Sequence, residues 1–172
     1  MSRLPAALVV VALSGCLTVP DPPPRVVPTL DLALAALPDR SVNFGEIPKS
    51  DYRGRVVMVS FIATWCFPCV ADLPVMQKLQ EQYAGQGYTT IAVGMDVDGP
   101  KMLRPFAEQY ALPYPLVWGS DELRNGETVF GRIHELPTRF LFGRDGSLVL
   151  AFSGVADPKV LVETVAKVVE AR

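Results

Sequence analysis

The chain has 172 residues, of which 49% are apolar and 20% are charged, and this composition is typical of one globular domain with a single core. Lys and Arg together number 16 and Asp and Glu number 18, which gives a net charge of −2. This near balance excludes the basic excess of a protein that binds phosphate backbones, so we expect no nucleic-acid partner.

The N-terminus has the pattern of a targeting segment. Arg3 precedes an apolar run over residues 4–13, which is too short to span a bilayer. The run ends in Leu-Ser-Gly-Cys, which resembles the lipobox of bacterial lipoproteins, in which Cys16 becomes the lipidated first residue. The alternative is an ordinary signal peptide with an incidental cysteine. The lipobox predicts a signal peptide over residues 1–15 and a lipid anchor on the periplasmic side of the cell envelope, in either the inner or the outer membrane.

Residues 16–29 are predicted to form a linker, because five prolines fall between Pro20 and Pro28. Such a segment favours an extended spacer, although a disordered tail has the same composition. The folded domain is expected over residues 30–172. At its start, residues 30–37 and 41–47 flank a turn and predict a β-hairpin, with a helical turn as the alternative for the first of them.

The remaining elements alternate between strand and helix before ending in a hairpin and a helix. Residues 55–62 are almost continuously apolar and β-branched, which predicts a strand that is buried on both faces. A loop over residues 119–135 is expected to hold a helical turn around Val129. The last helix is expected to bury one stripe, formed by Val160, Leu161, Thr164, Val165, Val168 and Val169. The other predicted elements are helices at 66–83, 100–110 and 158–171 and strands at 88–95, 114–118, 138–143 and 148–153.

Cys66 and Cys69 form a C-x-x-C pair where the buried strand is followed by a helix. Unpaired N–H groups and the helix dipole favour a thiolate there by up to about 2 kcal/mol, which would lower the pKa of the Cys66 thiol from about 8.5 to about 7. Cys66 is therefore predicted to attack a disulfide and Cys69 to resolve the mixed disulfide. No Lys, Arg or His lies between Arg55 and Lys78, so this segment offers no further cation and predicts a reductant or moderate exchanger.

Two other interpretations of the pair are weaker. A zinc site needs four ligands, and His134 is the only other soft ligand once Cys16 is lipidated. A structural disulfide is the second alternative. The position between strand and helix favours redox chemistry over both.

The motif VVMVSFIATWCFPC, with Trp65 before the pair and Phe67 and Pro68 inside it, resembles the thioredoxin superfamily. The most similar members are the membrane-tethered TlpA/ResA-like disulfide reductases, which have a redoxin (AhpC/TSA-like) domain. The resemblance extends over about residues 30–171 and includes Pro74 in the active-site helix. It implies an α/β thioredoxin-like fold, with a central mixed sheet flanked by helices, an N-terminal hairpin and an extra βα insertion before the cis-proline loop.

The resemblance also implies a cis Leu136–Pro137 bond that faces the cysteines and pairs with an extended substrate segment. An ordinary trans proline is the alternative. Ser60 stands where thioredoxin has a buried acid, so the resemblance makes Asp72 the candidate proton acceptor for Cys69. A solvated carboxylate is equally consistent with its place in the first turns of a helix. Phe67 is either a contact surface for a partner protein or a position that varies freely.

The resulting functional expectation is a protein-disulfide reductase that needs no cofactor and no metal. Its expected partners are a disulfide-containing client, with apocytochrome c as a candidate, and a membrane thiol donor. One alternative is a peroxiredoxin-like peroxidase, although Thr64 lies two residues before Cys66 and not three. The other is a copper-binding chaperone that uses Cys66, Cys69 and His134, with a surface histidine as the default for His134.

Overall fold

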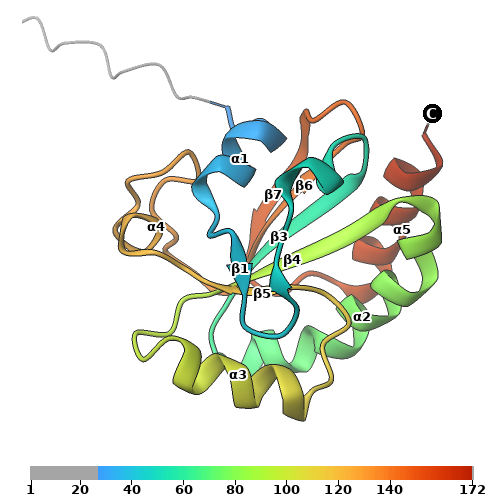
Figure 1. Cartoon of the computed structure of the whole chain (residues 1–172). Helices are drawn as coiled ribbons and strands as arrows, with labels where there is room; N and C mark the ends of the chain where they lie inside the picture. The colour runs from blue at the N-terminus through green and yellow to red at the C-terminus, as the bar shows by residue number, and fades with distance from the viewer. Residues whose placement is uncertain (1–26, 172) are drawn as a thin grey trace, which may run out of the picture.

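The computed structural model describes residues 27–171, so the expected signal peptide, Cys16 and most of the proline-rich linker lie outside the described residues. These residues form a seven-stranded sheet with helices on both faces (Figure 1). Between residues 27 and 171 no helix has the length and apolar character that crossing a membrane requires.

The strand that precedes the cysteine pair lies in the interior of the sheet. This strand, β3 (Val56–Ile62), runs parallel to β4 (Tyr88–Gly94) on one side and antiparallel to β6 (Thr138–Phe142) on the other. Beyond β4 lies the short parallel strand β5 (Leu116–Trp118), and β7 (Leu148–Ser153) forms the far edge beside β6. Every residue of β3 is buried, as the predicted two-sided strand requires.

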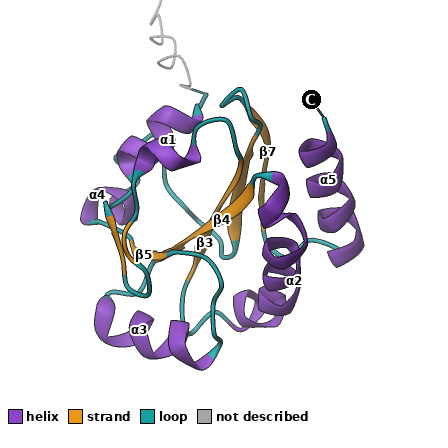
Figure 2. Cartoon of the chain, turned by 45° about the vertical axis from the view of Figure 1, so that its right-hand side comes forward, coloured by secondary structure: helices purple, strands orange, loops and turns teal. Residues whose placement is uncertain are grey.

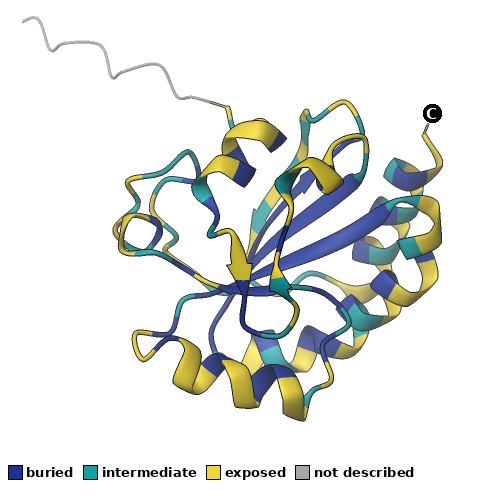
Figure 3. Ribbon diagram, viewed as in Figure 1, coloured by how far each residue is buried: buried dark blue, intermediate teal, exposed yellow. Residues whose placement is uncertain are grey.

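Two hydrophobic cores cover the two faces of the sheet. On one face pack α2 (Phe67–Tyr83), α3 (Pro100–Gln109) and α5 (Pro158–Glu170), as Figure 2 shows. The other face is covered by α1 (Leu30–Ala36), by α4 (Asp121–Asn125) and by the chain that follows α4. Figure 3 shows the buried strands between these outer layers. The architecture confirms the predicted α/β fold with a mixed sheet.

The N-terminal part differs from the expected hairpin of residues 30–37 with 41–47. The first of these segments is the helix α1, because Thr29 caps it by accepting a hydrogen bond from the backbone N–H of Leu32, and Leu30, Ala33 and Leu34 bury one face. The hairpin is smaller and follows the helix: β1 (Arg40–Ser41) pairs antiparallel with β2 (Gly45–Glu46).

The insertion between α3 and β6 consists of β5 and α4, as expected for an added βα unit. The expected turn is present around Val129, where the backbone N–H of Gly131 donates to the Thr128 carbonyl over 2.9 Å. The helix α4, which precedes this turn, was not expected from the local sequence pattern. Helix α4 begins after Ser120, whose side chain accepts a hydrogen bond from the backbone N–H of Leu123, and it ends at Gly126 in the left-handed conformation.

The stripe expected on α5 is also corrected at one position. Leu161, Val165 and Val169 are buried at a spacing of four residues, whereas Val160 is exposed. The residue after Asp157, the N-cap, is Pro158, so Val160 lies in the first turn, on the side away from the sheet.

Candidate active site

The two cysteines lie at the N-terminal end of α2. Cys66 is the N-cap and Cys69 lies in the first turn, and the two form a disulfide with a Cα–Cα distance of 5.2 Å. Both are almost completely buried, at 4% and 1% exposure. The backbone N–H of Cys69 donates to the Cys66 sulfur over 3.2 Å. After reduction, the same N–H group and the helix dipole would stabilise a thiolate on Cys66.

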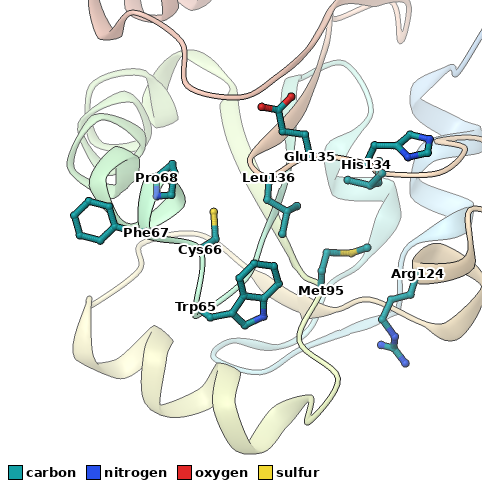
Figure 4. Close-up of a pocket in the computed structure, with 10 residues that line it drawn as sticks. Trp65, Cys66, Phe67, Pro68, Met95, Arg124, His134, Glu135 and Leu136 are labelled. Carbon is teal, nitrogen blue, oxygen red and sulfur yellow. The ribbon is translucent and has the colours of Figure 1, made fainter.

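A pocket of about 650 Å³ opens over Cys66. Trp65, Met95 and Leu136 form part of its wall, and in Figure 4 Leu136 points towards the space beside Cys66 and Trp65, whereas the Met95 side chain points away from Cys66. Cys66 lines this pocket, whereas Cys69 does not. The other lining residues are Phe67, Pro68, Arg124, Ile133, His134 and Glu135.

The loop opposite the cysteines contains the cis Leu136–Pro137 bond. Its shape is held by the Thr138 hydroxyl, which donates to the Glu135 carbonyl over 2.6 Å and lies 2.8 Å from the Ser153 hydroxyl. The backbone N–H of Gly154 donates to the Pro137 carbonyl. These bonds anchor the loop to β7 and leave Leu136 at the pocket.

Asp96 organises the turn that leads into the cysteine motif. Its buried carboxylate accepts hydrogen bonds from both the backbone N–H and the hydroxyl of Thr64. Its own carbonyl accepts a bond from the indole N–H of Trp118. The turn before Cys66 is thereby attached to the end of β4.

Asp72 is buried and paired, so the solvated-carboxylate interpretation is wrong for this position. Its Oδ2 lies 2.9 Å from Nη2 of Arg139, which comes from β6, and the two residues are 7% and 1% exposed. Asp72 lies on the same buried face of α2 as Cys69. Its role as proton acceptor stays a prediction.

His134 lines the pocket but does not complete a metal site. In Figure 4 its imidazole points away from the Cys66 sulfur. No group of three or more His, Cys, Asp or Glu side chains within residues 27–171 is placed to hold a metal ion. The geometry therefore gives no support to the copper-chaperone alternative.

A family model described as the AhpC/TSA family matches residues 27–151, which include β1 to β6, both cysteines and the cis-proline loop. The chain belongs to this family. Within the AhpC/TSA family, it is 36% identical over 107 residues to the thiol-disulfide oxidoreductase ResA of Geobacillus kaustophilus, an alignment that spans 61% of this chain and 58% of that protein. It is 30% identical over 125 residues to ResA of Bacillus thuringiensis subsp. konkukian, over 72% and 69% of the two chains.

Solved structures give the same assignment for the fold. A putative thiol:disulfide interchange protein DsbE from Chlorobium tepidum superposes with a TM-score of 0.64 at 27% identity, over 78% of this chain and 92% of that chain. A thiol:disulfide interchange protein of the thioredoxin family, from the same organism, gives a TM-score of 0.67 at 22% identity, over 76% and 90%. The predicted resemblance to ResA-like thiol-disulfide oxidoreductases with a thioredoxin-like fold is confirmed.

Two residues of this AhpC/TSA-family site were missed by sequence reasoning. Arg139 directly precedes the apolar residues of β6, which is buried along its whole length, and a charge in such a strand is a signal for a buried partner. Asp96 follows the apolar strand β4 and carries no comparable signal, because a strand end is an ordinary place for an acid.

The bonds between Thr64 and Asp96 give a stability prediction. Thr64→Val removes the hydroxyl donor and keeps the side-chain shape, so it is expected to lower the free energy of unfolding by about 1.5–3 kcal/mol, as for a hydrogen bond to a charged group. Thr128→Val is the matched control, since the Thr128 hydroxyl is buried without a partner among the described residues. Urea denaturation should show a loss for the first variant and none for the second; equal losses would contradict this role of Asp96.

Proposed function

We propose that this chain is an extracytoplasmic thiol-disulfide oxidoreductase that reduces disulfides in client proteins by cycling Cys66 and Cys69 between dithiol and disulfide. The observation that carries the proposal is the position of the pair at the start of α2, beneath a pocket whose opposite wall is the cis-proline loop. The names of the ResA relatives give independent support. The chain spans 58% of the first such relative's length, so the activity is argued here from the site.

The first step is attack by the Cys66 thiolate on one sulfur of the client disulfide. A Cys66–client disulfide forms, the client S–S bond breaks, and the second client sulfur leaves as a thiolate that takes up a proton. Cys69 then loses its proton and attacks the Cys66 sulfur. The Cys66–Cys69 disulfide forms, and the client sulfur that was bound to Cys66 leaves as a thiolate and takes up a proton. Two electrons have then passed to the client.

The pocket has the features needed to hold an extended client segment. Neither the N–H nor the C=O of Leu136 has a hydrogen-bond partner within residues 27–171, so both are available for pairing with a strand. Trp65 and Phe67 are 73% and 81% exposed beside the pocket and supply apolar contact area. Pro68 lines the same wall, and Asp72 is the candidate acceptor for the Cys69 proton.

The cellular setting follows from the N-terminal pattern. Residues 1–15 would be removed, lipidated Cys16 would hold the protein on the outer side of a membrane, and residues 16–29 would separate it from the folded domain, 30–172. A membrane thiol donor would reduce the Cys66–Cys69 disulfide after each turnover. Apocytochrome c is one candidate client.

Disulfide reduction tests the proposal directly. Full-length protein carrying Cys16→Ser, which removes the third thiol, is incubated with insulin and dithiothreitol, and chain separation is followed by turbidity. We expect acceleration over dithiothreitol alone. Consumption of hydrogen peroxide without insulin reduction would replace the proposal with the peroxidase alternative.

A further inference from the structure

The interior beneath the cysteine pair contains an ion pair that joins α2 to β6. Arg139 Nη2 donates to Asp72 Oδ2 over 2.9 Å, with both residues buried. Arg139 stands opposite Ser60 in the ladder between β3 and β6, two residues after Pro137. Asp72 follows Cys69 by three residues, a spacing that places two Cβ atoms about 5–6 Å apart on one face of a helix. The ion pair therefore lies between the turn that carries Cys69 and the strand that follows the cis-proline loop.

The guanidinium has spare hydrogen-bonding capacity. Its Nε and Nη1 have no hydrogen-bond partner among residues 27–171, and its Cζ lies 5.6 Å from the centre of the Phe152 ring. A buried cation with unbonded N–H groups is costly unless a negative charge compensates it. The carboxylate of Asp72 is the one anionic group paired with it within the described part of the chain.

The other groups that face Arg139 are neutral. Burial raises the pKa values of Tyr88 and Tyr114, and the positive charge of Arg139 acts in the opposite direction on both. The residues that α5 buries in this core, Leu161, Val165 and Val169, are apolar. Apart from the two cysteines, Asp72 and Arg139 therefore decide the charge of the buried region beneath the pair. Arg124, His134 and Glu135 line the pocket on the other side of Cys66, and they are the same in all the variants compared below.

We propose that Arg139 is a positioning residue for the redox pair, which compensates Asp72 so that the interior next to the cysteines accepts the negative charge that forms when the disulfide is reduced. This inference rests on the proposed function. In the reduction step a dithiol donor gives two electrons to the Cys66–Cys69 bond and becomes a disulfide itself. The products in this protein are a Cys66 thiolate and a Cys69 thiol; one of the donor's two thiol protons ends on Cys69 and the other is released to solvent.

Removing one partner at a time should shift the reactivity of Cys66 in opposite directions. Arg139→Met leaves the carboxylate uncompensated, so the pH midpoint of Cys66 alkylation rises and the rate below the midpoint falls about tenfold, which corresponds to one pH unit. Asp72→Asn leaves the guanidinium uncompensated, so the midpoint falls by a similar amount. The double variant should bring the midpoint back between those of the two single variants.

The experiment measures iodoacetamide alkylation of the reduced full-length Cys16→Ser protein from pH 5 to pH 10, with the Cys66 adduct quantified by peptide mass spectrometry. Arg144→Met is the matched control, because Arg144 bonds the carbonyls of Gln86 and Val169 beyond the other end of β6. Its loss should lower stability without moving the midpoint.

Midpoints that move in the same direction in Arg139→Met and Asp72→Asn, or that move in neither, would overturn the proposal and leave Arg139 a packing residue. If Arg139→Met does not fold, Asp72→Asn and the double variant still test the proposal. Asp72→Asn must lower the midpoint, and adding Arg139→Met to it must raise the midpoint again. Alkylation needs no client protein. A failed insulin assay with opposite midpoint shifts would therefore reject the proposed function and keep the role of Arg139.

Discussion

Cys66→Ser is expected to lower insulin reduction to the rate of dithiothreitol alone, because a hydroxyl replaces the only thiol among the described residues that lines the pocket. Cys69→Ser is expected to stop turnover at a different step. Cys66 still attacks the client, but no second thiol resolves the product. When the pre-reduced variant is incubated with client in the absence of dithiothreitol, a client bound through Cys66 should then accumulate as a band that reducing agent removes on a denaturing gel.

The two cysteine variants control for each other, since both lose the disulfide of the folded protein. If Cys66→Ser retained activity or trapped client while Cys69→Ser did not, the assignment of attacking and resolving cysteines would be reversed. Cys69 is 1% exposed and does not line the pocket, which argues against that outcome.

Phe61→Ala is expected to lower the free energy of unfolding by about 3–5 kcal/mol. Phe61 is fully buried in β3, and its ring makes edge-to-face contacts with Phe130 and Phe140 at centroid distances of 4.9 and 5.9 Å. Phe130 belongs to the segment that leads to the cis-proline loop. The cavity therefore weakens the attachment of that segment to the sheet as well as the core itself.

The matched control makes the same substitution at an exposed ring. Phe67→Ala should change the unfolding free energy by less than about 0.5 kcal/mol, because the side chain is 81% exposed. It should instead raise the KM for a protein client if Phe67 is a contact surface. Guanidinium denaturation curves that showed equal losses for Phe61→Ala and Phe67→Ala would contradict the packing described for β3.

The sequence predicted the parts of the fold that depend on local pattern. The strand β3 is almost continuously apolar, and this composition alone predicted that both of its faces are buried. The resemblance supplied the cis Leu136–Pro137 bond, which the structure contains. At residues 30–37 the local pattern could not distinguish a strand from a helix, because alternating Leu and Ala fit either one. The Thr29 cap and burial against the sheet favour the helix that the structure shows.

The electrostatics of the site could not be read from the segment around the cysteines. The absence of Lys, Arg and His between Arg55 and Lys78 is a correct local observation, but a cation arrives from β6, in the form of Arg139. Contacts between α2 and β6 depend on the register of the whole sheet. The prediction of a reductant was made from a segment without cations. It must now hold with the buried guanidinium of Arg139 beside the helix that carries the cysteines.

The reduction potential of the Cys66–Cys69 pair decides whether this protein reduces or forms disulfides. Full-length Cys16→Ser protein is equilibrated in dithiothreitol or glutathione buffers, with Trp65 fluorescence as the readout and mass spectrometry to confirm the oxidised peptide. We expect a reversible two-electron transition near the value of thioredoxin, about −270 mV. A potential near about −120 mV would identify an oxidant that forms disulfides, and would contradict the proposed direction of electron flow.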